Sequence, residues 1–227
     1  MAIPDSQLAS STRSIELSRL TARARQLADQ PSRCLLGIAG APGAGKTTLA
    51  RSLVTAVGNT ACLVGMDGFH LSQNVLTQLQ RLDRKGAIDT FDGPGFLTLI
   101  RRLRQPEADV VYAPEFRREI DESIAGAVAI GPEIGLVVVE GNYLLVPDAP
   151  WSSLRELFDE AWYCELPEPV RLERLIARHR SYGRSKEEAT DWALGPDQRN
   201  ADLVATTKQF ADLIVAADHD APISTSA

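Results

Sequence analysis

Short apolar runs of strand length alternate with stretches of helical spacing along most of the chain. One continuous β-branched run, Val137-Val138-Val139, has the pattern of a strand buried on both faces. The expected strands are Arg33–Ala39, Ala61–Met66, Leu136–Glu140, Glu160–Leu166 and Leu213–Ala217. The expected helices are Lys46–Val57, Pro94–Arg104, Trp151–Phe158, Pro169–Tyr182 and Ser185–Leu194, after an amphipathic helix within Arg13–Asp29. This alternation predicts an α/β fold with a doubly wound parallel sheet and helices on both faces.

The same pattern divides the chain into segments. Residues 1–12 look loose, and residues 1–32 form an N-terminal extension with its helix. Residues 33–217 carry the alternation and form one domain, and residues 218–227 form a C-terminal tail. An insert at about 109–130 interrupts the alternation, and the apolar residues near its two ends predict a small pair of strands. A chain of 227 residues is long enough for one such domain with a full core.

The junction between the first expected strand and the helix after it carries a phosphate-binding pattern. The run Gly40-Ala41-Pro42-Gly43-Ala44-Gly45-Lys46-Thr47 fits G-x-x-x-x-G-K-[ST] at every fixed position. Glycines let successive backbone N–H groups point into one concavity, and the following helix adds its positive N-terminal end. Lys46 can reach the β- and γ-phosphates, and the Thr47 hydroxyl can take a Mg²⁺ position. We therefore expect a nucleoside triphosphate to bind over this loop, which ends at Thr48.

Two acidic residues end or follow other expected strands, at the edge where open parallel sheets bind ligands. Glu140 ends the third strand and is placed to hold Mg²⁺, directly or through water. Asp67 follows the second strand and is placed to accept a proton from an attacking hydroxyl, to orient that hydroxyl, or to share the metal. Each acid could instead cap a turn or a helix start. The phosphate loop in the same chain favours a catalytic use.

Basic residues gather late in the chain. Arg171, Arg174 and Arg178 fall at i, i+3 and i+7, so they share one helix face. That face could be an ordinary solvated one. In an acidic protein with a phosphate loop, we expect a lid at about 169–186 that closes over the triphosphate, with Arg174 and Arg178 stabilising the transferring phosphoryl group. No Asn-Lys-x-Asp guanine-reading motif follows the sheet, which disfavours a GTPase.

Composition narrows the range of partners. A net charge of -6 and a pI of about 5.2 disfavour a broad basic surface for nucleic acid. No apolar run reaches the roughly 18 residues of a membrane span, and the N-terminus lacks the basic and apolar regions of a secretory signal. Cys34, Cys62 and Cys164 are far apart and lie in or beside apolar runs, as reduced, buried thiols of a cytoplasmic protein do.

The ordered set of motifs resembles a known group of P-loop kinases, the uridine kinase, pantothenate kinase and phosphoribulokinase group. The order of that group is matched by the phosphate loop, Met66-Asp67-Gly68-Phe69-His70, the segment from Lys85-Gly86 to Thr90-Phe91-Asp92, Val139-Glu140-Gly141-Asn142-Tyr143 and the arginine-rich lid. The later run Asp197-Gln198-Arg199-Asn200-Ala201 is similar to that of bacterial nucleoside and sugar kinase-like members, some with fructokinase-like labels. The resemblance covers roughly residues 33–217.

The resemblance implies ATP-dependent transfer of a phosphoryl group to a hydroxyl of a small metabolite, with ATP and Mg²⁺ as cofactors. Asp67 would be the catalytic base, Glu140 would take the Walker-B-like place, and Asn200 and its neighbours would lie near the adenine. The acceptor pocket would be made partly by His70, Phe91, Asp92, Phe116, Arg117 and Tyr143. From the residues alone, His70 could instead simply pack, and Asp92 could also cap the helix that begins at Pro94.

The chain departs from the uridine kinase pattern after the inserted strand. Uridine kinases carry Pro-x-Tyr-Asp there, whereas this chain reads Ala113-Pro114-Glu115-Phe116-Arg117-Arg118. A polyhydroxylated substrate requires both hydrogen-bond donors and acceptors, and these are offered by Asp67, His70, Asp92 and Arg117. We therefore expect a sugar or sugar-like acceptor first, a pantothenate-type acceptor second and a nucleoside third.

Two other classes of function stay open at this point. A P-loop ATPase that acts as a switch or chaperone would turn over ATP steadily without an acceptor, and little in the sequence favours it. A nucleotide-binding regulatory protein without catalysis would not need the intact set of Lys46, Thr47, Asp67 and Glu140. The sequence leaves open whether the chain is a monomer or a homodimer.

Overall fold

The computed structural model describes residues 5–105 and 109–216. At its centre is a five-stranded sheet with the strand order β2-β5-β1-β6-β7. Its strands are β1 (Cys34–Gly40), β2 (Ala61–Gly65), β5 (Leu136–Glu140), β6 (Glu160–Glu165) and β7 (Leu213–Ala216). Every neighbouring pair in this sheet is parallel. The expected strands and the doubly wound α/β fold are therefore confirmed.

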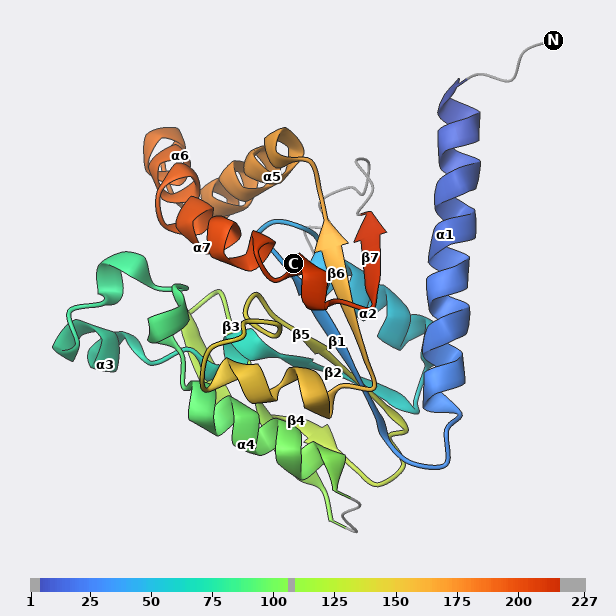
Figure 1. Cartoon of the computed structure of the whole chain (residues 1–227). Helices are drawn as coiled ribbons and strands as arrows, with labels where there is room; N and C mark the ends of the chain where they lie inside the picture. The colour runs from blue at the N-terminus through green and yellow to red at the C-terminus, as the bar shows by residue number, and fades with distance from the viewer. Residues whose placement is uncertain (1–4, 106–108, 217–227) are drawn as a thin grey trace.

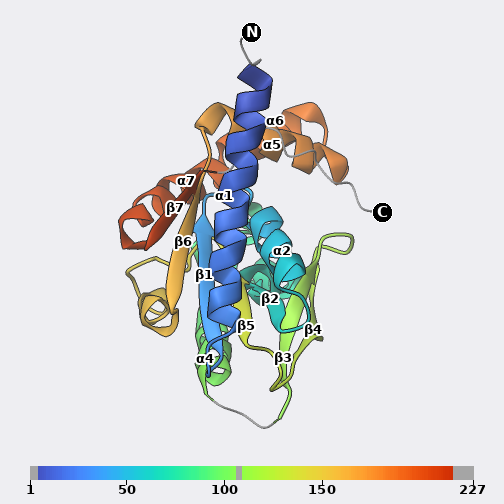
Figure 2. The same ribbon diagram turned by 90° about the vertical axis from the view of Figure 1, so that its right-hand side faces the viewer.

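Helices cover both faces of the sheet. They are α1 (Asp5–Ala28), α2 (Lys46–Val57), α3 (Gln73–Gln78), α4 (Gly93–Arg104), α5 (Glu168–Ser181), α6 (Lys186–Leu194) and α7 (Pro196–Ala205). Figure 2 shows α1 and α2 side by side on one face, whereas α4 lies on the other face (Figure 1). Helices α5, α6 and α7 gather at the carboxyl end of β6, and α3 lies on an arm away from the sheet (Figure 1).

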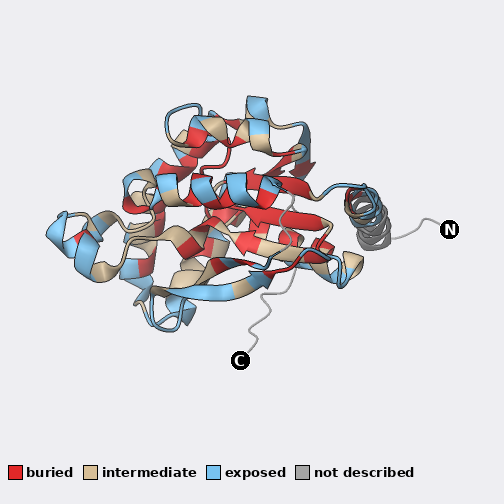
Figure 3. Ribbon diagram, turned by 90° about the horizontal axis from the view of Figure 1, so that it is seen from below, coloured by how far each residue is buried: buried red, intermediate tan, exposed pale blue. Residues whose placement is uncertain are grey.

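The core has two halves because each central strand is buried on both sides. In β1, Leu36 and Ile38 pack with α1 and α2, whereas Leu35 and Ala39 pack with α4. Figure 3 shows the buried residues running along the strands and the exposed ones on the outer surfaces of the helices. A sheet buried in this way explains why its strands read as continuous apolar runs. Charged residues at the ends of these strands depart from the apolar pattern, so they are candidates for a functional role.

The insert forms an antiparallel hairpin of β3 (Val111–Arg117) and β4 (Glu122–Ile130). The expected strand pair is thus confirmed, with longer strands than the sequence pattern indicated. The register shifts between Ala113 and Glu115. Between these two pairs β3 advances by two residues and β4 by four, so β4 carries the irregularity. Val111 and Ala113 are buried in the core before this point, and Phe116 contacts His70 after it.

Three helix predictions need correction. Helix α1 begins at Asp5, within the stretch that was expected to be loose. The predicted helix Trp151–Phe158 is replaced by two 3-10 turns, Trp151–Ser153 and Arg155–Leu157, which still bury the apolar residues that produced the helical spacing. Helix α7 was not expected, although Pro196 occupies a favourable first-turn position. The predicted tail 218–227 lies outside the described residues.

The remaining helix signals and the cysteines follow the sequence more closely. Ser185 caps α6 through a complete capping box with Glu188. Cys34 and Cys164 are buried and Cys62 is half-buried, all as free thiols. Burial raises the pKa of Cys62 and of Cys164 to about 12, so both thiols stay protonated near neutral pH. Within the described part of the chain, we find no helix with the length and apolar character of a membrane span.

Candidate active site

The phosphate loop holds its lysine in a buried position between two strand ends. Gly43 and Gly45 adopt positive φ values of 82° and 88°, which glycine adopts without steric cost. The Lys46 Nζ donates to the Ala41 carbonyl at 3.0 Å and to Asn142 Oδ1 at 2.8 Å. Burial lowers the pKa of Lys46, and the charges of two nearby acids, first Glu140 and then Asp67, oppose this shift. The ammonium group is therefore fixed where the loop meets the end of β5.

The two predicted acids lie in the same small region. Glu140 is buried at the end of β5, and its Oε1 accepts a hydrogen bond of 3.3 Å from the Thr47 hydroxyl. Burial, followed by the charge of Asp67, raises the pKa of Glu140. For Asp67, burial opposes ionisation, but electrostatic interactions, first with His70 and then with Arg118, hold its pKa below its ordinary value. The two carboxyl groups therefore repel each other and favour a cation between them.

The inserted hairpin packs directly on the turn that carries Asp67. This turn is the 3-10 segment Met66–Phe69 at the end of β2. A Cβ atom on Gly68 would lie 2.4 Å from the Pro114 carbonyl oxygen, so only glycine permits this contact. The close approach brings Arg118 to Asp67, with Nη2 of the arginine 3.2 Å from Oδ2 of the carboxylate. Arg118 lies just beyond β3, on the same face as Phe116.

His70 sits between two aromatic rings next to this ion pair. Its ring centroid lies 4.1 Å from that of Phe91 and 4.8 Å from that of Phe116. His70 Nδ1 is 2.8 Å from the Asp67 carbonyl oxygen, which can only accept, so Nδ1 carries the proton and donates. Burial lowers the pKa of His70, which favours the neutral ring. Nε2 of the neutral ring is then a hydrogen-bond acceptor beside Asp67.

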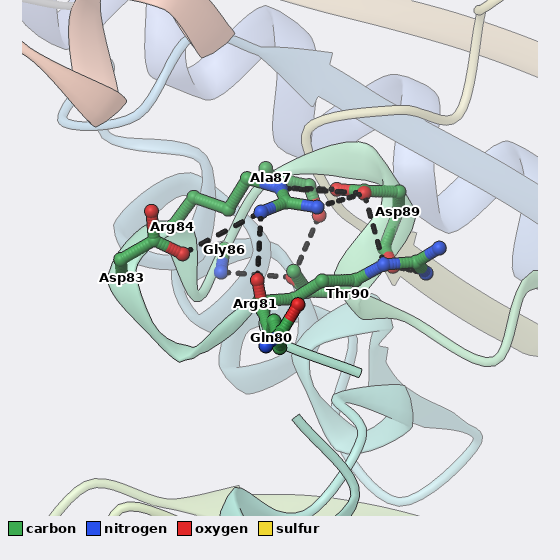
Figure 4. Close-up of polar contacts among 8 residues, drawn as sticks. All are labelled: Gln80, Arg81, Asp83, Arg84, Gly86, Ala87, Asp89 and Thr90. Atoms are coloured by element: carbon green, nitrogen blue, oxygen red, sulfur yellow. Dashed lines mark hydrogen bonds and ion pairs between the residues drawn. The ribbon is translucent and has the colours of Figure 1, made fainter. Parts of the chain in front are cut away.

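The loop that precedes Phe91 is held in shape by its own polar contacts (Figure 4). The guanidinium of Arg84 donates to Asp89, with a shortest distance of 2.9 Å. Thr90 Oγ1 accepts from the Gly86 N–H at 3.0 Å and donates to the Ala87 carbonyl at 2.7 Å. The Gly86 carbonyl accepts from the Tyr143 hydroxyl at 2.7 Å and from Asn200 Nδ2 at 3.2 Å. The loop is therefore tied both to the sheet and to α7.

Helix α5, the predicted lid, already rests on the phosphate loop. A Cβ atom on Gly43 would lie 2.7 Å from Leu175 Cγ and 3.0 Å from the Arg171 carbonyl oxygen. Arg171 is buried and donates to the Pro42 carbonyl at 3.4 Å and to Gln198. Burial and the charge of Arg118 lower the pKa of Arg178, whereas Asp197 and Asp67 oppose this. Arg171 therefore anchors the helix, and the charge of Arg178 interacts with those of Arg118 and Asp67.

A cavity of about 260 Å³ opens beside Ala41, between the end of β6, the start of α5 and one face of α7. The residues that line it include Tyr163, Leu166, Arg171, Gln198, Ala201 and Asp202. Asn200 does not line this cavity, since its side chain is turned toward Gly86. Its neighbours Gln198 and Ala201 on α7 line the cavity instead. The helical periodicity of α7, which the sequence pattern did not predict, separates them.

The structure brings together most of the predicted catalytic residues but only part of the predicted acceptor pocket. Lys46, Thr47, Glu140, Asp67, His70, Phe116 and Arg178 converge on one region. Phe91 and Tyr143 are buried in the core, and Asp92 caps α4 by accepting from the Gly95 N–H at 2.9 Å. Arg117 pairs with Glu115 at 2.9 Å on the opposite face of β3. Arg174 is half-buried on α5.

Four site residues were missed by the sequence analysis as individual side chains. Asn142 and Lys85 lie in runs that the motifs contain, but nothing in the runs singles them out. Arg171 was seen as part of a basic face, whereas its role as a buried anchor depends on the packing of α5. Arg117 was expected in the acceptor pocket, whereas its neighbour Arg118 contacts Asp67 and Arg117 pairs with Glu115.

The comparisons with known proteins agree with this geometry. No family model matches the chain. The chain is 31% identical over 207 residues to the candidate uridine kinase C227.14 of Schizosaccharomyces pombe, covering 85% of this chain and 87% of that protein. Over 137 residues it is 28% identical to the pantothenate kinase of Latilactobacillus sakei, covering 58% of this chain and 44% of that protein.

A solved structure adds to these relatives. It is that of a candidate fructose transport system kinase from Silicibacter sp. TM1040, with 36% identity and a TM-score of 0.77, covering 88% of this chain and 98% of that one. Together with the fission-yeast relative, it matches most of the chain. The chain therefore belongs to the uridine kinase, pantothenate kinase and phosphoribulokinase group of P-loop kinases, and it is an ATP-dependent phosphotransferase that acts on a small metabolite.

Proposed function

We propose that the chain transfers the γ-phosphoryl group of ATP to a hydroxyl of a sugar or sugar-like acceptor, with Asp67 as the base. The observation that carries the proposal is the position of Asp67 between two sets of side chains. Its carboxylate interacts with Lys46 of the phosphate loop on one side and with Arg118 on the other. A hydroxyl bound to Asp67 would lie beside phosphates held at Lys46, as in-line transfer requires.

The cavity beside Ala41 supports a site for the adenine of ATP. It adjoins the phosphate loop and continues away from Lys46 toward α7. Ala201 and Leu166 give it apolar walls, and the residues after β6 give it backbone polar groups. ATP would then run from α7 across the phosphate loop to Asp67.

The residues around Thr47 fit a Mg²⁺ ion that arrives with the nucleotide. Magnesium is commonly bound through one or two carboxylates together with substrate phosphates. Glu140 and Thr47 offer such oxygen ligands, with Asp67 nearby, and Glu140 has a raised pKa as expected for a carboxyl group buried without its cation. Among the described residues, no three His, Cys, Asp or Glu side chains form a metal cage by themselves. The bound ion would neutralise charge on the β- and γ-phosphates.

The groups around Asp67 suit an acceptor rich in hydroxyls. Asp67 and His70 Nε2 can accept hydrogen bonds, and the Arg118 guanidinium can donate several. The Phe116 ring supplies a flat apolar surface beside them. A site with this many polar groups disfavours an analogue that lacks hydroxyls, because its own groups would lose their partners.

The Arg178→Ala variant is expected to lower kcat by about 10²-fold, because Arg178 would stabilise charge on the transferring group. Its melting temperature should change little, since burial and the charge of Arg118 oppose the attraction of Arg178 to Asp197 and Asp67. The matched control is Arg180→Ala, on the same helix with an exposed side chain. Steady-state kinetics at saturating ATP will measure the effect. Equal losses in the two variants would argue against a lid contact at Arg178.

The acceptor class is tested by measuring kcat/KM for sugars, pantothenate and nucleosides at fixed Mg-ATP. We expect a sugar or sugar-like compound to give the highest value. A nucleoside that exceeded every sugar by tenfold would overturn this ranking and leave the kinase assignment in place. ATP turnover at the same rate with and without every acceptor would instead indicate a P-loop ATPase.

A further inference from the structure

We propose that the acceptor carries an anionic group, a carboxylate or a phosphate ester, near the hydroxyl that is phosphorylated, and that Arg118 selects for it. In this arrangement Arg118 covers Asp67 until the anion of the acceptor draws the guanidinium away. The inference rests on the proposed role of Asp67 as the base, and it adds a charge requirement that the phosphate loop does not impose.

Two cations flank one aromatic ring on the acceptor side of Asp67. The Arg118 Cζ lies 6.0 Å from the Phe116 ring centroid, and Lys85 Nζ lies 5.2 Å from the same centroid. Arg118 comes from the hairpin and Lys85 from the loop before Phe91, so neither belongs to the phosphate loop or the lid. The Lys85 ammonium is paired with Asp121, so the guanidinium of Arg118 is the cation offered here to an anion other than the nucleotide.

The ion pair between Arg118 and Asp67 is easily exchanged. It is a contact of 3.2 Å between Nη2 and Oδ2, and the two side chains are 39% and 32% exposed. Ion pairs this accessible to water add little stability. A carboxylate or phosphate group offers the guanidinium two oxygens in the fork geometry that arginine prefers. An anionic acceptor therefore competes successfully for Arg118.

The backbone around Arg118 is held in place, so only its side chain needs to move. Lys85 Nζ bonds to Asp121 Oδ2 at 2.9 Å, and the Gln73 N–H donates to Glu122 Oε1 at 3.0 Å. These contacts fix the hairpin turn to the arm that carries α3. The Lys85 side chain is only 10% exposed, which keeps its charge close to the Phe116 ring. The anion site is thus formed before the acceptor arrives.

Exchange of Arg118 has a consequence for the chemistry. While the guanidinium occupies Asp67 Oδ2, that oxygen is less available to a substrate hydroxyl. A neutral acceptor leaves the arginine in place, and an anionic acceptor removes it. Discrimination by charge should therefore lower kcat for neutral acceptors as well as raise their KM.

The experiment uses the full chain and three acceptors that share one carbon skeleton: a neutral sugar, the corresponding sugar acid and the corresponding sugar phosphate. These are assayed with the unaltered chain, with Arg118→Gln and with the control Arg117→Gln, whose arginine faces the other side of β3. We expect the unaltered chain to prefer an anionic member by about 10²-fold in kcat/KM. Arg118→Gln should lose about that factor for the anionic member and much less for the neutral sugar, so that the preference between them disappears, whereas Arg117→Gln should keep the preference.

Three outcomes would overturn the inference. A preference for the neutral sugar would remove the charge requirement while leaving the proposed transfer to a hydroxyl intact. Equal loss on all three acceptors in Arg118→Gln would assign Arg118 to the ATP phosphates. Phosphorylation of none of the three, together with rapid phosphorylation of a nucleoside, would refute the proposed acceptor and the inference together. Comparison of the sugar acid with the sugar phosphate identifies which anion is recognised.

Discussion

Lys46→Met is expected to reduce kcat by about 10³-fold at saturating Mg-ATP. The ammonium group is fixed by the Ala41 carbonyl and by Asn142, so it meets the phosphates without reorganising. Methionine keeps most of the length of the side chain and removes its charge. A coupled assay of ADP formation with the preferred acceptor will measure the loss.

The fold should tolerate this change. Lys46 is buried and burial lowers its pKa. In the absence of ATP, the buried charge therefore lowers the stability of the folded chain. The melting temperature of Lys46→Met should therefore equal or exceed that of the unaltered chain. Arg51→Met, an exposed position on the same helix, is the control and should retain full activity. Near-normal turnover by Lys46→Met would refute the assignment of the phosphate loop.

Asp67→Asn is expected to lower kcat by about 10²–10⁴-fold while ATP affinity changes little. Asparagine keeps the shape of the side chain but cannot take the proton of an attacking hydroxyl. It also weakens the contact with Arg118, whose partner loses its negative charge. Pre-steady-state kinetics with ATP binding measured separately will distinguish transfer from binding.

The control for this variant is Asp83→Asn, an exposed carboxylate on the loop before Phe91. It should leave both kcat and KM unchanged. If Asp67→Asn instead lost ATP affinity and kept its kcat, Asp67 would belong with Glu140 and the metal. That result would remove the base from the proposed reaction without affecting membership of the kinase family.

Sequence reasoning succeeded where one physical rule decides the outcome. Val137-Val138-Val139 has the pattern of a strand buried on both faces, and the run from Gly40 to Thr47 has the pattern of a loop that curls around a phosphate. The positions of Asp67 and Glu140 followed from the rule that parallel strands end at one edge. These predictions depend on local pattern and topology, both of which the sequence contains.

It failed where the outcome depends on packing between distant segments. Arg118 contacts Asp67 and Arg117 pairs with Glu115, and the apolar pattern of the hairpin does not indicate which of these neighbouring arginines reaches the site. The helical phase of α7, which turns Asn200 to Gly86, was not predicted either. Trp151, Leu154 and Phe158 have helical spacing, yet 3-10 turns bury all three. Each of these outcomes is set by a partner that lies far away in the sequence.

The carbonyl group of Gly86 has a consequence for how the two substrates affect each other's binding. It accepts one hydrogen bond from Tyr143 at the end of β5 and another from Asn200 on α7, the helix beside the cavity near Ala41. A nucleotide that displaces α7 must therefore also move or strain the loop before Phe91, which carries Gly86. The two binding equilibria are then linked, so the factor by which ATP changes acceptor affinity equals the factor by which the acceptor changes ATP affinity. A single peptide carbonyl would thereby couple the two halves of the catalytic cycle.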